Sequence, residues 1–317
     1  MKSNLDGFAI ALSRAIGIIT LVAMLGAALI ALAAEAKQKT FATPEDAAKA
    51  LVAATKSGDL KAMLDILGLG SKGIVQSGDA VADRGGRERF VKAYEEANRL
   101  EKSGDAKFVL SVGKDNWPLP IPIVKDAAGW RFDTQAAKEE ILNRRIGRNE
   151  LSAIQAVQAF VDAQREYYLR NPQKDKLLHY AQKFISAQGK RGGLYYPTKA
   201  GEQASPLGPL FERAKAVGYE KGKDAGKPVP YHGYYYRILT SQGSNAPGGK
   251  YSYLINGYMV GGFALLAYPA KYGSSGVMTF LVNQNGAIYQ KDLGEDTEKI
   301  ALGVKEFNPD KTWTKLE

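Results

Sequence analysis

Apolar and polar positions along the chain follow two different periods, which predict separate helical and β-rich stretches. Apolar residues at helical spacing predict helices over residues 44–57, 60–67, 87–100, 134–146 and 210–216, and a longer helix that begins near Asn149. Short β-type runs predict strands over residues 108–112, 121–124, 130–132, 234–240, 253–255, 258–260, 263–268, 277–283 and 287–292. The chain is therefore predicted to have an α+β fold.

Local signals mark several ends of these elements. Thr43, followed by Pro44, is typical of a helix N-cap, and Gly58 is typical of a helix end. Asn256-Gly257 and Asn285-Gly286 predict tight hairpins, because both residue types tolerate the positive backbone angles of such turns. The segment from residue 189 to residue 231 is rich in Gly, Lys and Pro, and we expect a long irregular excursion there.

The order of the elements predicts two compact domains. Residues 41–146 place helices before a strand meander, which resembles the cone-shaped fold of the cystatin and nuclear-transport-factor type, where a curved sheet wraps a helix. Residues 147–317 place a long helix before an antiparallel sheet, which resembles the globular part of pilins, most closely over residues 263–289. The chain departs from pilins because its apolar N-terminal helix does not continue into this domain, so we do not expect filament assembly.

Residues 1–36 differ in composition from the rest of the chain. Lys2 and Arg14 precede an almost uncharged run over residues 15–34, and a polar stretch follows from Glu35, which is the layout of an export signal helix. Small residues stand at cleavage spacing at the end of the run, in residues 31–36. The run is also long enough to span a bilayer, so the segment is either a cleaved signal peptide or an N-terminal membrane anchor. Both predict an exported protein, periplasmic or associated with the cell envelope.

Charge points to the kind of partner that the exported part would meet. The net charge is +10, and removing residues 1–36 leaves it unchanged because Lys2 and Arg14 are balanced by Asp6 and Glu35. Outside the cytoplasm, this charge favours contact with an envelope protein, anionic lipid or an anionic surface polymer. Nucleic acid is not an expected partner, because the short basic clusters lack interleaved aromatic residues. Membrane contact is expected only through the N-terminal segment, if that segment is uncleaved.

No motif in the chain predicts catalysis, a metal or a cofactor. The chain has no cysteine and two histidines, His179 and His232, neither of which has the spacing of a metal ligand. We expect His179 to be a half-buried spacer and His232 a turn residue. The acids Asp292, Glu295 and Asp296 are typical of a solvated turn, and Ser274 and Ser275 lack the strand-to-helix context of a nucleophile. A non-enzymatic role is therefore favoured.

Tyrosine is the residue type that points most directly to recognition. It presents an apolar ring with a polar tip, which suits contact with a glycan or a protein, and it is concentrated in residues 195–268. In alternating strands about half of these rings would face the core instead. The candidate binding residues are Tyr195, Tyr196, Tyr234, Tyr236 and Arg237.

A competing hypothesis places the activity in the first domain. In a cone-shaped fold, Tyr94, Trp117 and Trp130 would line a cavity that binds a small molecule or supports hydrolysis. This alternative depends on the analogy of fold alone. It requires a concave pocket rather than a cone filled by the side chains of the chain itself.

Four passages of the mature chain carry a more specific resemblance. They are residues 149–154 (Asn-Glu-Leu-Ser-Ala-Ile), 162–167 (Asp-Ala-Gln-Arg-Glu-Tyr), 232–240 (His-Gly-Tyr-Tyr-Tyr-Arg-Ile-Leu-Thr) and 276–280 (Gly-Val-Met-Thr-Phe). Through them, residues 41–297 resemble the bacterial family of proteins of unknown function numbered 2950. The resemblance implies a secreted or envelope protein, and the family supplies no catalytic or binding residues to transfer.

Overall fold

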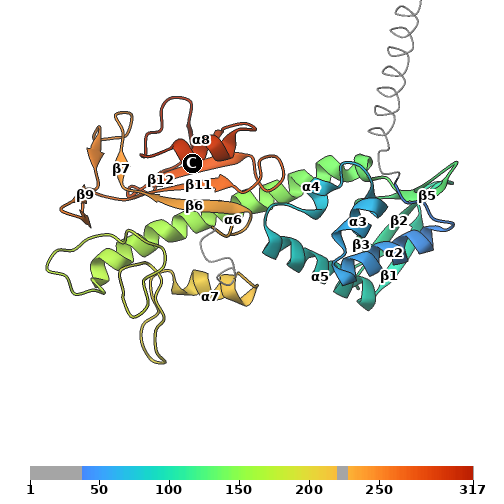
Figure 1. Ribbon diagram of the computed structural model, residues 1–317, viewed down its shortest axis with the longest axis horizontal. Coiled ribbons are helices and arrows are strands. Elements are labelled where there is room, and N and C mark those ends of the chain that lie inside the picture. Colours follow the sequence, from blue (N-terminus) through green and yellow to red (C-terminus); the bar gives the residue numbers. More distant parts are fainter. Residues whose placement is uncertain (1–37, 220–227, 317) are drawn as a thin grey trace, which may run out of the picture.

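The computed structural model describes residues 38–219 and 228–316 and shows an α+β fold, as the sequence predicts. The signal or anchor predicted over residues 1–36 lies outside the described residues. Two antiparallel sheets lie toward opposite ends of one long helix, α6 (Thr134–Arg170) (Figure 1). Each sheet carries its own cluster of buried apolar side chains.

The N-terminal sheet packs against a group of short helices. Its five strands are β1 (Asn98–Lys102), β2 (Lys107–Val112), β3 (Trp117–Pro118), β4 (Ile123–Asp126) and β5 (Gly129–Phe132), in the order β1-β2-β4-β5 with β3 also paired to β2. The helices are α2 (Pro44–Ser57), α3 (Leu60–Leu67), α4 (Lys72–Val75) and α5 (Ala80–Glu96). Helix α2 contacts β4 and β5. Thr43 and Gly58 cap α2 as the sequence predicts.

Helix α5 differs from the helix predicted over residues 87–100. It begins earlier because the side chain of Asp79 accepts hydrogen bonds from the first backbone amides of the helix. It ends earlier because residues 98–102 pair with β2 as strand β1. The prediction was wrong at both ends, since a glycine pair at 85–86 obscures the start and the pairing partner of β1 is not local in sequence.

Helix α6 is one continuous helix of 37 residues, where the sequence predicted two helices separated near Gly147. A mid-helix glycine disfavours the helix by only about 1 kcal/mol, which packing at both ends outweighs. Thr134 and Ala137 are buried at one end, and residues from Ala153 to Tyr167 join the core of the C-terminal sheet at the other. The domain boundary expected at residues 146 and 147 falls inside this helix, and the division into domains stays a prediction.

Because Gly147 lies in a helix with no other atom near the position of a Cβ, we expect Gly147→Ala to raise the free energy of unfolding by about 0.5–1 kcal/mol. Chemical denaturation measures this change. The matched control is Gly58→Ala, where φ is +70° and the same added methyl group is expected to destabilise. Equal effects of the two substitutions would contradict this account.

The C-terminal sheet lies between α6 and α8 (Thr297–Gly303), as Figure 1 shows. Its five strands, in the order β14-β13-β12-β11-β6, are β6 (Tyr234–Leu239), β11 (Ala264–Pro269), β12 (Met278–Asn283), β13 (Ile288–Asp292) and β14 (Thr314–Lys315). Every residue of β11, which lies between β12 and β6, is buried, because both faces of the sheet are covered there.

Two small hairpins and one short helix complete this half of the molecule. The hairpins are formed by β7 (Ser241–Gln242) with β8 (Tyr251–Ser252), and by β9 (Leu254–Ile255) with β10 (Tyr258–Met259). Helix α7 covers Gly208–Ala216, close to the predicted range. Within residues 38–219 and 228–316, no helix combines the length and the apolar character needed to cross a bilayer.

Candidate functional site

The candidate residues Tyr195 and Tyr196 lie in the irregular stretch between α6 and α7. The Tyr195 ring stacks on Phe211 of α7 with ring centroids 4.5 Å apart, and its hydroxyl donates to Glu212. Tyr196 is buried, and the guanidinium of Arg191 lies 5.2 Å from its ring centroid. Both tyrosines therefore have packing partners inside the chain.

The other three candidates lie on strand β6. Tyr234 is fully buried and its hydroxyl donates to the backbone carbonyl of Met278, while the Tyr236 hydroxyl donates to the carbonyl of Tyr231. Burial raises the pKa of Tyr236 well above its ordinary value. Arg237 donates to the carbonyls of Ala301, Leu302 and Val304, where a positive charge complements the C-terminus of α8.

The structure does not bring these five residues into one site. No hydrogen bond or ring contact among the described residues joins the group at 195–196 to the group on β6. A binding role for them stays a prediction. Sequence reasoning could not tell which tyrosines are buried and which are exposed, because a tyrosine facing the core and one facing solvent look the same in a strand with many tyrosines.

A buried carboxyl group, Asp79, joins the two halves of the molecule. It is 1% exposed; one oxygen accepts from the amides of Val81 and Ala82 at the start of α5. The other oxygen accepts from the Tyr219 hydroxyl at 2.6 Å and from the Gly233 amide at 2.9 Å. Two of these four hydrogen bonds cap α5, and the other two tie its start to the segment that leads into β6. The Asp79 cap was missed because the helix was expected to begin at residue 87.

Aromatic rings surround this junction. The rings of Tyr231 and His232 are 4.3 Å apart, and Tyr219 lies 5.1 Å from Tyr231. Burial, with Asp79 as the second cause, raises the pKa of Tyr219 far above its ordinary value. Burial lowers the pKa of His232, and Asp79 opposes that shift. His232 has φ +50°, which confirms that it is a turn residue.

We expect His232→Asn to weaken the pH dependence of stability below the ordinary histidine value of 6.5. The fold favours neutral His232, so as the pH falls below 6.5 the unfolded chain takes up a proton more readily and stability is lost. Asparagine accepts the left-handed backbone and does not titrate. Thermal unfolding at about pH 7.5 and about pH 5 measures the loss, which we expect to be larger for the native chain. Equal losses would exclude a contribution from His232.

Further hydrogen bonds reinforce the junction. The carbonyl of Gly73 accepts from Arg145 of α6 and from the hydroxyl of Ser274. The Asn149 amide donates to the carbonyl of Ser275 at 2.8 Å. Ser274 and Ser275 therefore belong to a turn that contacts α6 and the N-terminal half.

Three of the four passages that resemble the family meet at this place. One carboxylate oxygen of Glu150 accepts from the amides of Val277 and Met278, at 3.0 and 2.9 Å. Asn149, next to it, holds the turn before residue 276, and Gly233 is bonded to Asp79. The passages at 149–154, 232–240 and 276–280 therefore share a structural junction, although they are far apart in sequence.

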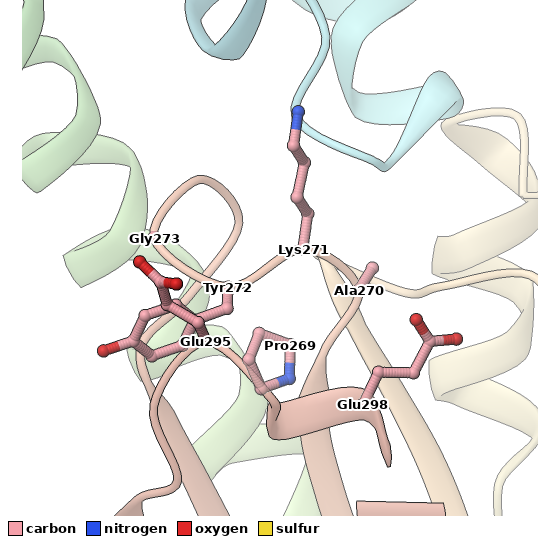
Figure 2. A pocket seen from close by; sticks show the side chains of 7 residues that line it. All are labelled: Pro269, Ala270, Lys271, Tyr272, Gly273, Glu295 and Glu298. Carbon is pink, nitrogen blue, oxygen red and sulfur yellow. The ribbon is translucent and has the colours of Figure 1, made fainter.

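A depression of about 470 Å³ lies beside the junction. It is lined by Pro269, Ala270, Lys271, Tyr272, Gly273, Glu295 and Glu298. In Figure 2 the Lys271 side chain extends toward the N-terminal half, Glu295 lies beside Tyr272, and Glu298 lies on the opposite side. The two glutamates do not converge on one point. Asp292, Glu295 and Asp296 are all exposed, which confirms the predicted solvated turn.

The cavity expected in the first domain is not formed by the residues that were assigned to it. Trp130 is buried with its ring against Phe108, at a centroid distance of 5.3 Å, whereas Trp117 on the short strand β3 is 51% exposed. Buried side chains such as Phe132 fill the space between helices and sheet. A depression of about 430 Å³ lies between α2 and α5, and neither tryptophan nor Tyr94 lines it. The prediction of a shared aromatic cavity was wrong because β3 and β5 present their tryptophans to different surroundings.

The histidine predicted to be a spacer has a structural role. His179 is buried, one ring nitrogen lies 2.8 Å from a carboxylate oxygen of Asp175, and the other lies 3.1 Å from the carbonyl of Tyr180. Within residues 38–219 and 228–316, no three side chains of His, Cys, Asp or Glu lie close enough to hold a metal ion.

The stretch that follows α6, residues 171–218, forms a surface that we call the basic segment. It contains eight lysine or arginine residues and three acids. Each acid has a partner inside the segment, because Asp175 binds His179, Glu202 binds Arg191 and Glu212 binds Tyr195. Among the described residues, no acid forms an ion pair with the exposed residues Lys183, Lys190 or Lys199. The basic segment therefore carries exposed positive charge that no acid in the described chain compensates.

Comparison with known proteins gives one match. A family model described as "Protein of unknown function (DUF2950)" matches residues 38–316, nearly all of the chain. No curated protein and no solved structure matches the chain.

Proposed function

Because the chain belongs to the DUF2950 family, whose function is unknown, we propose a role from the surface: an exported, non-enzymatic protein of the cell envelope that contacts an anionic envelope polymer through the basic segment. The observation that carries this proposal is the set of lysines at 183, 190 and 199, exposed and without an acidic partner in the described chain. Such charges attract an anionic surface, and the attraction weakens as salt screens it.

Retention of the full chain on purified envelope polymer, at low and at high salt, tests the proposal. We expect Lys183→Gln, Lys190→Gln and Lys199→Gln, combined in one variant, to weaken retention at least about tenfold. The matched control combines Lys49→Gln, Lys107→Gln and Lys114→Gln, which remove the same charge from exposed positions in the N-terminal half. Equal retention of both variants, or retention that salt does not weaken, would refute the proposal. Retention by an envelope protein instead would assign the contact to a protein partner.

Export requires a test of its own. We propose that residues 1–36 direct the chain across the inner membrane, either as a cleaved signal or as an anchor, on the evidence of their charge and apolar pattern. N-terminal sequencing of the protein from native membranes and periplasm distinguishes the two. Recovery of the intact chain from the soluble cytosol would refute export.

A further inference from the structure

Four exposed apolar side chains lie on two stretches that contact each other, residues 177–182 of the basic segment and the hairpin of β9 and β10. Leu177, Leu178, Ile255 and Tyr258 are 50%, 39%, 55% and 40% exposed, and we call them the apolar tip. The ring of His179, which follows Leu178 in the chain, lies 5.2 Å from the ring of Tyr258, so the two stretches lie side by side. Figure 1 places β9 at the end of the molecule farthest from the N-terminal sheet.

Hydrogen bonds and ring packing beside the apolar tip hold it at the surface, away from the core. The amide of Tyr180 donates to the carbonyl of Met259, and the side chain of Gln182 donates to the carbonyl of Gly257. The Tyr180 ring packs edge-on against Phe263, and both Met259 and Phe263 are fully buried. With the supporting residues already packed, the exposed side chains have no space in the core to enter.

The surroundings of the apolar tip are positively charged. No acid occurs between Asp175 and Glu202, or between Lys250 and Asp292. Asp175 is bonded to the buried His179. Lys174, Lys176 and Lys183 are exposed in the same segment.

We propose that the apolar tip and its flanking lysines dock on the surface of an anionic lipid bilayer. Apolar side chains enter the interface between headgroups and acyl chains while lysines hold the anionic headgroups, and tyrosine is suited to that depth. A protein partner is a weaker fit, since lysine is depleted in protein interfaces. This inference rests on the proposed function, because the flanking lysines belong to the same basic segment, and it adds anionic lipid as the material that this end of the segment meets beside the polymer.

The absence of cysteine makes a site-specific probe practical. The full chain with Ile255→Cys carries an environment-sensitive dye and is mixed with vesicles of phosphatidylglycerol and phosphatidylcholine. We expect blue-shifted emission and quenching by lipid-borne quenchers. The control is Leu302→Cys. Leu302 is 50% exposed and belongs to α8, which lies across the C-terminal sheet from α6, so a dye at this position should stay in water. The comparison holds even if residues 1–36 insert, since insertion there does not by itself bring Ile255 to the lipid.

A second variant tests the charges. Lys174→Gln with Lys176→Gln is expected to weaken the response of the Ile255 dye about fivefold for each lysine removed, and vesicles of phosphatidylcholine alone should give no response. A dye at Ile255 that stays in water on anionic vesicles overturns the inference. If the chain still binds lipid-free envelope polymer in a salt-dependent way, only the lipid inference fails. If the dye response on vesicles and the binding to envelope polymer are both absent in a chain whose thermal unfolding is unchanged, the proposed function fails as well.

Discussion

Replacing Asp79 by alanine is expected to lower the free energy of unfolding by about 3 kcal/mol or more. The substitution removes the cap of α5 and leaves the Gly233 amide and the Tyr219 hydroxyl without their acceptor in a buried place. A buried donor without a partner loses the full free energy of its hydration. Chemical denaturation followed by circular dichroism measures the change.

Two controls separate the cap from the junction. Asp59→Ala removes a cap from α3 at an exposed position, so we expect a loss of about 1 kcal/mol. Tyr219→Phe removes one hydrogen bond of Asp79 and the acceptor of the His232 amide but leaves the ring, so the loss should be about 1–2 kcal/mol. If Asp79→Ala were no more harmful than Asp59→Ala, Asp79 would contribute only a helix cap and would not join the two halves.

The second large effect is expected for Gly276→Ala, with a loss of about 2–3 kcal/mol. A Cβ at this position would lie 2.6 Å from the ring carbon Cζ of Tyr234 and would also contact its hydroxyl oxygen. Tyr234 is fully buried and bonded to Met278, so the ring has little space in which to move. Thermal and chemical unfolding both report the loss.

The control is Gly303→Ala at the end of α8, where nothing lies within 4 Å of the added carbon and stability should change little. A double variant provides a sharper test. Tyr234→Leu removes the ring that the methyl group meets, so Gly276→Ala combined with Tyr234→Leu should cost less than the sum of the two single changes. Additive losses would show that the methyl group does not act through Tyr234.

Local sequence signals predicted much of the fold because they depend on neighbouring residues. The capping of α2 by Thr43 and Gly58, and the turn at Asn256-Gly257, follow from the backbone angles that these residues accept. Strands β6, β11, β12 and β13 of the C-terminal sheet were predicted within about two residues for the same kind of reason, whereas the two-residue strand β14 was not predicted. The ends of α5 and the continuity of α6 were not predicted, since pairing with β2 and packing at both ends of α6 decide them.

The junction between the two halves could not be predicted from the sequence either, because it also depends on contacts between distant residues. Asp79 and Gly233 are 154 positions apart, and no period in either segment indicates that the two will be bonded. The tyrosines of this half show a similar limit, because only the structure separates the fully buried candidate Tyr234 from the exposed Tyr258, which was not chosen as a candidate. A hydropathy pattern indicates which side chains prefer burial and does not indicate which surface is left open.

The unbroken course of α6 fixes the distance between the two ends of the molecule. A helix of 37 residues is about 55 Å long, and unlike a flexible linker it resists bending and compression. Helix α6 is therefore a rigid spacer between the apolar tip and the N-terminal sheet, near which the described chain begins. If both ends are attached at once, the protein either lies lengthwise along one surface or holds two surfaces at a set separation.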